Sequence, residues 1–222
     1  MDNPLQVWTF DEFVGVASVI SEKVALSAAH CFNETDPSKY HLLGGTAMLN
    51  GTDGVQFNID KLIKHPGFDA ATKNYDIAVI RIVESFLELP NVAFIPLQNT
   101  FISSTSTRDC SVLGWGSTVN GTVSDTLQST AMQIRPQLNC VNTWDFLTAV
   151  GTNGSITPQM FCAESEASDV CRGDSGGGLI CNGRLAGLLA WDEDECNGRG
   201  PTFFTRVSNY EIRKFIRDHA GV

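Results

Sequence analysis

Short apolar segments rich in β-branched and aromatic residues recur along this chain, and clusters of turn-forming residues separate them. The first two, Gln6–Phe10 and Phe13–Ile20, each have the length of a single strand. Gly44-Gly45 and the NGTDG run at residues 50–54 are turn signals between later segments. Turns that recur about every 8–12 residues predict an all-β barrel or sandwich.

The same patterns predict how the rest of the chain is organised. Ser208–His219 starts with a capping-type serine and places Tyr210, Ile212, Phe215 and Ile216 at helical spacing, which predicts a terminal helix. A shorter helix is predicted over Leu138–Leu147. Val24–Cys31 reads as a strand that runs into small residues. Other predicted strands lie within Tyr40–Ile63, Asn74–Ile82, Cys110–Gly116, Leu127–Ile134, Gly178–Cys181, Leu185–Trp191 and Thr202–Val207.

Length and charge exclude several classes of function. With 222 residues and 42% hydrophobic content, the chain can bury a core as one domain or as two small barrels. A net charge of -10 argues against a nucleic-acid partner, which needs clustered Lys and Arg. No apolar run has the length of a membrane span, and Met1–Pro4 has no signal-peptide character. We therefore expect no membrane or nucleic-acid partner, and any secretion signal is removed or was never present.

The cysteines and sequons indicate an oxidising compartment. Seven cysteines are present, with no CxxC pair and no HExxH motif, so no zinc site and no cofactor is expected. Four N-x-[ST] sequons lie among turn-forming residues, at Asn33, Asn50, Asn120 and Asn153. Together they predict a secreted, extracellular glycoprotein. Because seven is odd, one thiol is free, paired between molecules, or left without a former partner.

The segment Cys171–Gly178, which reads CRGDSGGG, places a serine between glycines and beside a carboxylate. Glycine permits a sharp turn and a close approach to a ligand, so Ser175 would project from a tight loop. A hydroxyl is a weak nucleophile unless a base removes its proton. Taken alone, the segment is equally well explained as a Gly-rich hairpin turn.

A base and an orienting carboxylate have candidates earlier in the chain. His30 follows the small residues Ala28-Ala29, although a single histidine is more often structural. Asp76 leads into an apolar strand, where it is either a strand-start residue or the acceptor of a hydrogen bond from an imidazole.

The blocks AAHC (28–31), DIA (76–78) and GDSGG (173–177) occur in the order His, Asp, Ser, and this set resembles the chymotrypsin/trypsin family of serine proteases. Gly114-Trp115-Gly116, Phe161-Cys162-Ala163 and the terminal helix fit the same family. The resemblance implies two packed six-stranded antiparallel barrels with a site between them. The implied N-terminal barrel is 1–95, the linker 96–109, and the C-terminal barrel with its helix 110–222.

The resemblance also implies roles for single residues. Ser175 would be the nucleophile, His30 the general base and then acid, and Asp76 the residue that orients the imidazole. The N–H groups of Gly173 and Ser175 would form the oxyanion hole, which typically contributes about 3 kcal/mol per donor.

Three disulfides are implied by the same resemblance: Cys110–Cys181, Cys140–Cys162 and Cys171–Cys196. Cys31 is left without a partner, because the family's partner position falls at Val14. The family's calcium loop falls at residues 45–55, where Gly45, Thr52 and Val55 replace carboxylates, so no metal is expected there.

Asp174 is implied to be the activation residue, because the family's freed amino terminus pairs with the acid before the nucleophile. The expected Ile-Val-Gly-Gly terminus is absent here, and the chain starts about a dozen residues inside the family's mature start. We therefore expect Asp174 to lack that cation, which would leave the loop zymogen-like.

The implied specificity pocket gives conflicting indications. Asp169 aligns with the acid that gives trypsin its preference for Arg and Lys, whereas Thr202 and Asp192 fall where open pockets have glycines. The acidic run 192–195 is either a solvated loop or an attraction for basic substrates. The preference for the P1 residue thus stays open between basic and small. The implied substrate-binding residues are Asp169, Val170, Arg172, Trp191, Asp192 and Thr202.

The sequence predicts a secreted serine endopeptidase that acts on proteins or peptides through an acyl-enzyme. Its other expected partners are protein inhibitors, and we expect a monomer. The alternative is a zymogen-like or non-catalytic homologue that acts as a binding or regulatory protein.

Overall fold

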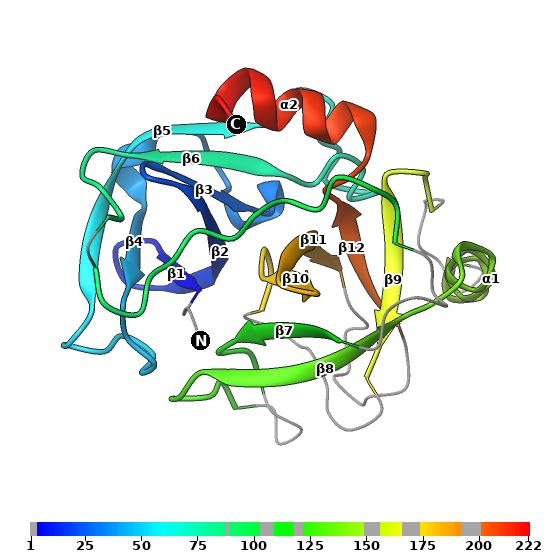
Figure 1. Ribbon diagram of the computed structural model, residues 1–222, viewed down its shortest axis with the longest axis horizontal. Helices are drawn as coiled ribbons and strands as arrows, with labels where there is room; N and C mark the ends of the chain where they lie inside the picture. Colours follow the sequence, from blue (N-terminus) through cyan, green and yellow to red (C-terminus); the bar gives the residue numbers. More distant parts are fainter. Residues whose placement is uncertain are drawn as a thin grey trace.

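The computed structural model describes residues 4–87, 89–102, 109–117, 122–148, 156–165, 174–191 and 201–222, with side chains included except at 144–148. Within these ranges the strands close into two antiparallel barrels, one after the other along the chain (Figure 1). The predicted all-β fold of two six-stranded barrels with a terminal helix is confirmed. Each barrel closes on itself, so its strand edges are paired.

The first barrel has the strand order β1-β2-β3-β6-β5-β4. Its strands are β1 (Leu5–Trp8), β2 (Phe13–Ser21), β3 (Val24–Ser27), β4 (His41–Gly44), β5 (Val55–Lys64) and β6 (Ala78–Ile82). Two 3₁₀ turns, η1 (Ala29–Cys31) and η2 (Pro37–Lys39), lie between β3 and β4. Strand β6 is shorter than the strand predicted within Asn74–Ile82, because residues 74–77 form a loop before it.

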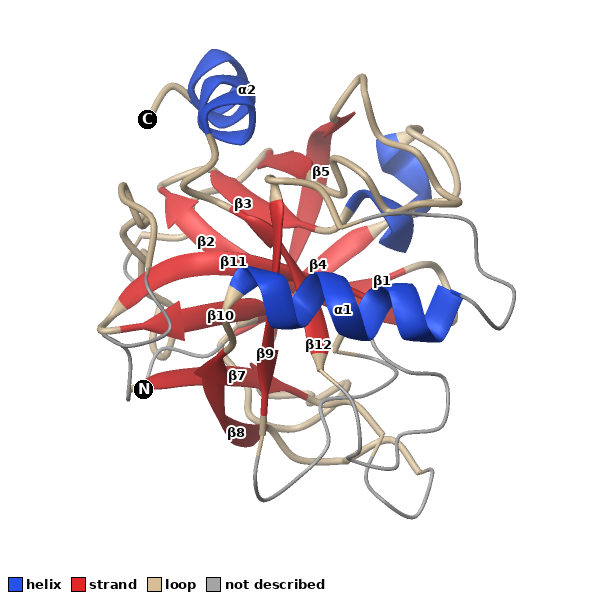
Figure 2. Cartoon of the chain, turned by 90° about the vertical axis from the view of Figure 1, so that its right-hand side faces the viewer, coloured by secondary structure: helices blue, strands red, loops and turns tan. Residues whose placement is uncertain are grey.

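The second barrel has the order β10-β11-β12-β9-β8-β7. Its strands are β7 (Cys110–Gly114), β8 (Gln128–Ile134), β9 (Met160–Glu164), β10 (Gly178–Cys181), β11 (Arg184–Trp191) and β12 (Thr202–Arg206). The segment after β6 crosses from the first barrel to the second (Figure 1). Helix α1 (Gln137–Thr148) lies on the outside of the second barrel beside β9 (Figure 2).

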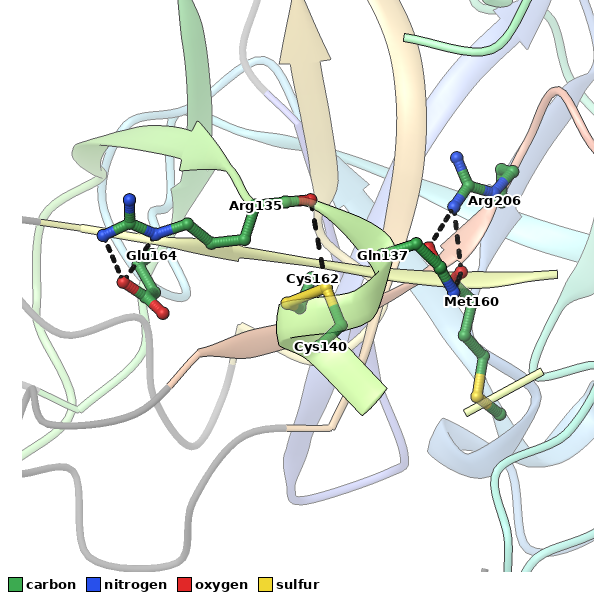
Figure 3. The surroundings of a disulfide bond; sticks show 7 residues. All are labelled: Arg135, Gln137, Cys140, Met160, Cys162, Glu164 and Arg206. Atoms are coloured by element: carbon green, nitrogen blue, oxygen red, sulfur yellow. Dashed lines mark hydrogen bonds and ion pairs between the residues drawn. A yellow bond between two sulfur atoms is a disulfide. The ribbon is translucent and has the colours of Figure 1, made fainter. Parts of the chain in front are cut away.

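Two disulfides tie the second barrel together, and both pairs are those implied by the resemblance. Cys110–Cys181 joins β7 to β10, and Cys140–Cys162 joins α1 to β9 (Figure 3). Arg206 of β12 supports the same region, since its Nη2 donates to Gln137 Oε1 at 2.8 Å and to the Met160 carbonyl at 3.0 Å (Figure 3). The third expected pair, Cys171–Cys196, lies outside the described residues.

Helix α2 (Tyr210–Ala220) packs against both barrels. Its Ile212, Phe215 and Ile216 are buried in a cluster with residues of β3 and β6 from the first barrel and of β11 from the second. Asn209, and not the expected Ser208, caps the helix, because its extended backbone lets Oδ1 accept from the N–H groups of Glu211 and Ile212. Tyr210 is not part of the apolar face, since it lies at the first helical position and is 71% exposed.

None of the helices in the described part of the chain is long and apolar enough to cross a membrane.

Candidate active site

His30 and Asp76 meet because β3 and β6 pair antiparallel. Ser27 at the end of β3 lies opposite Ala78 at the start of β6. The turn η1 after β3 and the loop before β6 therefore leave the barrel at the same edge. His30 lies three residues beyond Ser27, and Asp76 two residues before Ala78, which brings the two side chains together.

The imidazole of His30 is held by the buried carboxylate of Asp76. His30 Nδ1 lies 2.6 Å from Asp76 Oδ2, and the His30 backbone N–H donates to Oδ1 at 2.9 Å. The Asp76 side chain is 0% exposed and the His30 side chain 18%. Because an ionised carboxylate only accepts hydrogen bonds, Nδ1 carries the proton and Nε2 of the neutral ring is left as a base.

The loop that carries Asp76 is fixed from the second barrel. Thr205 Oγ1 donates to the Asp76 carbonyl at 2.9 Å, and the Tyr75 N–H donates to Gln159 Oε1 at 3.2 Å. Gln159 Nε2 and Thr157 Oγ1 both donate to Asn74 Oδ1. Sequence reasoning missed these supporting residues, since single polar residues 84 or 129 positions from their partners give no local signal.

Tyr75, directly before Asp76, has a φ of 53°, which is a left-handed conformation that is unusual for a bulky residue. Its ring stacks on His65 with the ring centroids 4.4 Å apart. Backbone strain of this kind costs about 1–3 kcal/mol and persists only where surrounding contacts impose it. The stacking and the bonds from the second barrel are such contacts.

The Ser175 loop lies against the segment that leads to His30. The Ser175 carbonyl accepts from the Val16 N–H at 2.8 Å, and the Gly176 N–H donates to the Leu189 carbonyl at 2.9 Å. Gly176 has a φ of +77°, and a Cβ there would lie 2.5 Å from the Val16 carbonyl oxygen and 2.8 Å from the Ala28 nitrogen. Only glycine fits this approach, and residues 174–177 form a turn, closed by the Gly177 N–H donating to the Asp174 carbonyl at 2.8 Å, that packs between the two barrels.

Asp174 is buried at the base of this loop and lies against the Gly114–Gly116 segment. Its Oδ1 accepts from the Gly116 N–H at 2.8 Å. A Cβ on Gly114 or Gly116 would lie 2.9 Å or 2.5 Å from the carboxyl carbon. Both glycines are therefore required where they stand, because they make room for the Asp174 carboxylate. Trp115 between them is fully buried, and its Nε1 donates to the Ala47 carbonyl at 3.0 Å.

The family model described as Trypsin matches residues 7–214. The chain belongs to the trypsin family of serine proteases. It is 30% identical to a trypsin of Xenopus laevis over 199 residues, covering 87% of this chain and 76% of the relative. Trypsin I-P1 of Gallus gallus is 32% identical over 200 residues, and Serine protease 1 of Homo sapiens 31% over 199; each match covers 87% of this chain and 75% of the relative.

Among solved structures, the fold is similar to that of neuropsin, a serine protease expressed in the limbic system of mouse brain. The two share 24% identity and superpose with a TM-score of 0.84, over 99% of this chain and 94% of that one.

Cys31 is the one cysteine outside a disulfide among the described residues of this trypsin-family chain. Burial and the neighbouring Asp76 charge raise the pKa of its thiol to about 12. Val14, the expected partner position, is partly buried against the same cluster of residues.

Two of the residues that the sequence predicts to bind substrate lie within the described ranges. The Trp191 ring packs on Phe203, with centroids 5.3 Å apart, and Thr202 is buried on β12 opposite Ala163. The remaining sequence-predicted residues lie outside the described residues: Asp169, Val170, Arg172, Gly173 and Asp192.

Proposed function

We propose that the protein is a serine endopeptidase that hydrolyses peptide bonds through Ser175, His30 and Asp76. The observation that carries the proposal is the His30–Asp76 pair. The Asp76 carboxylate is buried, whereas the His30 imidazole is partly exposed to solvent. Ser175 is itself partly exposed, on a loop that packs against the segment leading to His30. A nucleophile, a base and an orienting acid are the groups that acyl transfer requires.

The proposed reaction has two stages. His30 Nε2 takes the proton of Ser175 Oγ as this oxygen attacks the scissile carbonyl, and the imidazolium is stabilised by the Asp76 carboxylate. The N–H groups of Gly173 and Ser175 would bind the oxyanion. His30 then protonates the leaving amine, which leaves an acyl-enzyme on Ser175. Water, deprotonated by His30, releases the acid product and restores the serine.

The substrates proposed are proteins or peptides, with P1 open between basic and small residues. Secretion is supported by the two disulfides, and by the exposed positions of Asn33 and Asn50 in their sequons. We also propose that the chain divides into an N-terminal barrel at 1–95, a linker at 96–109 and a C-terminal barrel with its helix at 110–222.

A serine-directed fluorophosphonate tests this function on the full-length, processed protein. We expect one covalent adduct, located by mass spectrometry on Ser175 and absent from Ser175→Ala. Asp76→Asn should lower kcat by about 10⁴-fold on a peptide substrate, because the amide favours the wrong imidazole tautomer. A folded, processed protein that neither reacts with the probe nor cleaves peptides would support the non-catalytic homologue instead.

A further inference from the structure

A cavity of about 260 Å³ lies between α2, the start of β11 and the connection between the barrels. None of the candidate active-site residues that the structure describes lines it. Its apolar wall includes Ile20, Ile95 and Leu97, and two arginines enter it from separate elements, Arg184 from β11 and Arg213 from α2. An apolar wall with a few converging polar groups is the usual composition of a small-ligand site.

Arg213 lines this cavity and carries one donor without a partner among the described residues. Its Nη2 donates to Asn99 Oδ1 at 2.8 Å. Its Nη1 is buried and has no hydrogen-bond partner, and among the described residues it is the only buried side-chain nitrogen or oxygen of this kind. Buried charged donors are normally paired, so an unpaired guanidinium nitrogen beside a cavity indicates a missing acceptor.

The two arginines that line the cavity favour an anion as that acceptor. Arg184 is exposed, and its Nη1 donates to the Leu97 carbonyl at 3.3 Å; its other guanidinium donors have no partner among the described residues. Burial and the positive charge of Arg217 both lower the pKa of Arg213. Neither Arg184 nor Arg213 forms an ion pair within the described part of the chain. These two cationic side chains line the same cavity in a protein whose net charge is -10.

We propose that this cavity is a binding site for a small tetrahedral oxyanion, of the phosphate or sulfate class, held between Arg213 and Arg184. Guanidinium groups bind oxyanions through charge-assisted and frequently bidentate hydrogen bonds. Arg184 and Arg213 enter the cavity from different elements, and a tetrahedral anion has oxygens in several directions that can accept from both guanidinium groups. The site is independent of the proposed peptidase activity.

Isothermal titration calorimetry on the full chain tests the site, with inorganic phosphate and inorganic sulfate titrated separately at constant ionic strength in chloride. We expect one saturable site per chain for at least one of the two anions, and the two titrations identify the preferred one. Arg184→Gln should weaken binding about tenfold, as expected for the loss of a charge-assisted hydrogen bond. Because Arg184 is exposed, this variant keeps the fold even if Arg213→Gln does not.

Arg217→Gln is the matched control, since Arg217 carries the same charge on the same helix but does not line the cavity. We expect its affinity to stay within about twofold of the original. The proposal is overturned if neither anion gives a saturable isotherm. It is equally overturned if Arg184→Gln leaves the affinity unchanged, or if Arg217→Gln weakens binding as much as Arg184→Gln does, since the attraction would then be diffuse.

Discussion

The thiol of Cys31 follows His30 directly in the chain, yet its surroundings make it chemically different from a reactive cysteine. It is buried in the core of the first barrel, where desolvation and the Asp76 charge raise its pKa to about 12. The neighbouring Ser27 side chain lowers the pKa and is a smaller influence. A thiol in this state is protonated at neutral pH and is a poor nucleophile, because the thiolate is the reactive form.

We therefore predict that Cys31 resists alkylation in the folded protein. With iodoacetamide at pH 8, peptide mapping should find Cys31 unmodified under native conditions and modified once denaturant is added. Rapid labelling of Cys31 in the folded protein would contradict the raised pKa and the burial together. The denatured sample is the control for the intrinsic reactivity of the thiol.

At the scale of elements, strand and helix existence could be predicted from the sequence better than their ends. Alternating or continuous apolar segments identified most strands, but β9 was known only as the family block Phe161-Cys162-Ala163, since five residues without clear alternation do not predict a strand. The start of α2 was predicted one residue early, because Ser208 and Asn209 are both capping residues. Which of the two residues caps the helix depends on their backbone conformation, which the local sequence does not predict.

Helix α2 rests on an aromatic group that contains a titratable ring. The ring of His65, just after β5, stacks on Tyr75 and packs edge-on against Phe215 of α2, at 4.8 Å between centroids. Burial lowers the pKa of His65 from 6.5, and His219 lowers it further while Glu211 raises it. The unfolded chain therefore binds this proton more readily than the folded chain. The contribution of neutral His65 to the free energy of unfolding is therefore fully present above pH 6.5, and it is lost as the pH falls below this value.

We predict that His65→Phe, which keeps a ring in the stack but cannot be protonated, loses less free energy of unfolding between pH 7 and pH 5 than the unsubstituted protein. Urea denaturation at the two pH values measures this difference. His219→Gln is the matched control and should keep most of the acid-dependent loss, because burial is the main influence on the His65 pKa. An equal loss in His65→Phe would show that other groups set the acid sensitivity.

At the scale of the whole molecule, each barrel contributes to the candidate site and also fixes the other. The first barrel supplies His30 and Asp76, and the second supplies the Ser175 loop together with Thr205 and Gln159, which hold the loop of Asp76. The family motif in the sequence was sufficient to propose His30, Asp76 and Ser175 as site residues. It gave no indication of Thr205, which lies 129 positions from Asp76, because such a contact exists only after both barrels have closed and packed.

The Thr205 hydroxyl is a direct test of this dependence between the barrels. Thr205→Val replaces it by a methyl group of similar size and leaves the buried Asp76 carbonyl without this donor, which should cost about 1–3 kcal/mol of stability. If the bond also positions Asp76, kcat on a peptide substrate should fall about 10-fold to 100-fold, since small misplacements of catalytic groups cost this much. KM should change little, because Thr205 is buried and bonds to Asp76.

Thr205→Ser retains the hydroxyl and should restore kcat even where the lost methyl group reduces stability. Urea denaturation and steady-state kinetics on both variants separate the two effects. Unchanged kcat in a destabilised Thr205→Val would mean that the bond joins the barrels without orienting Asp76. A parallel fall of kcat in both variants would mean that packing of the methyl group, and not the hydrogen bond, holds the Asp76 loop in place.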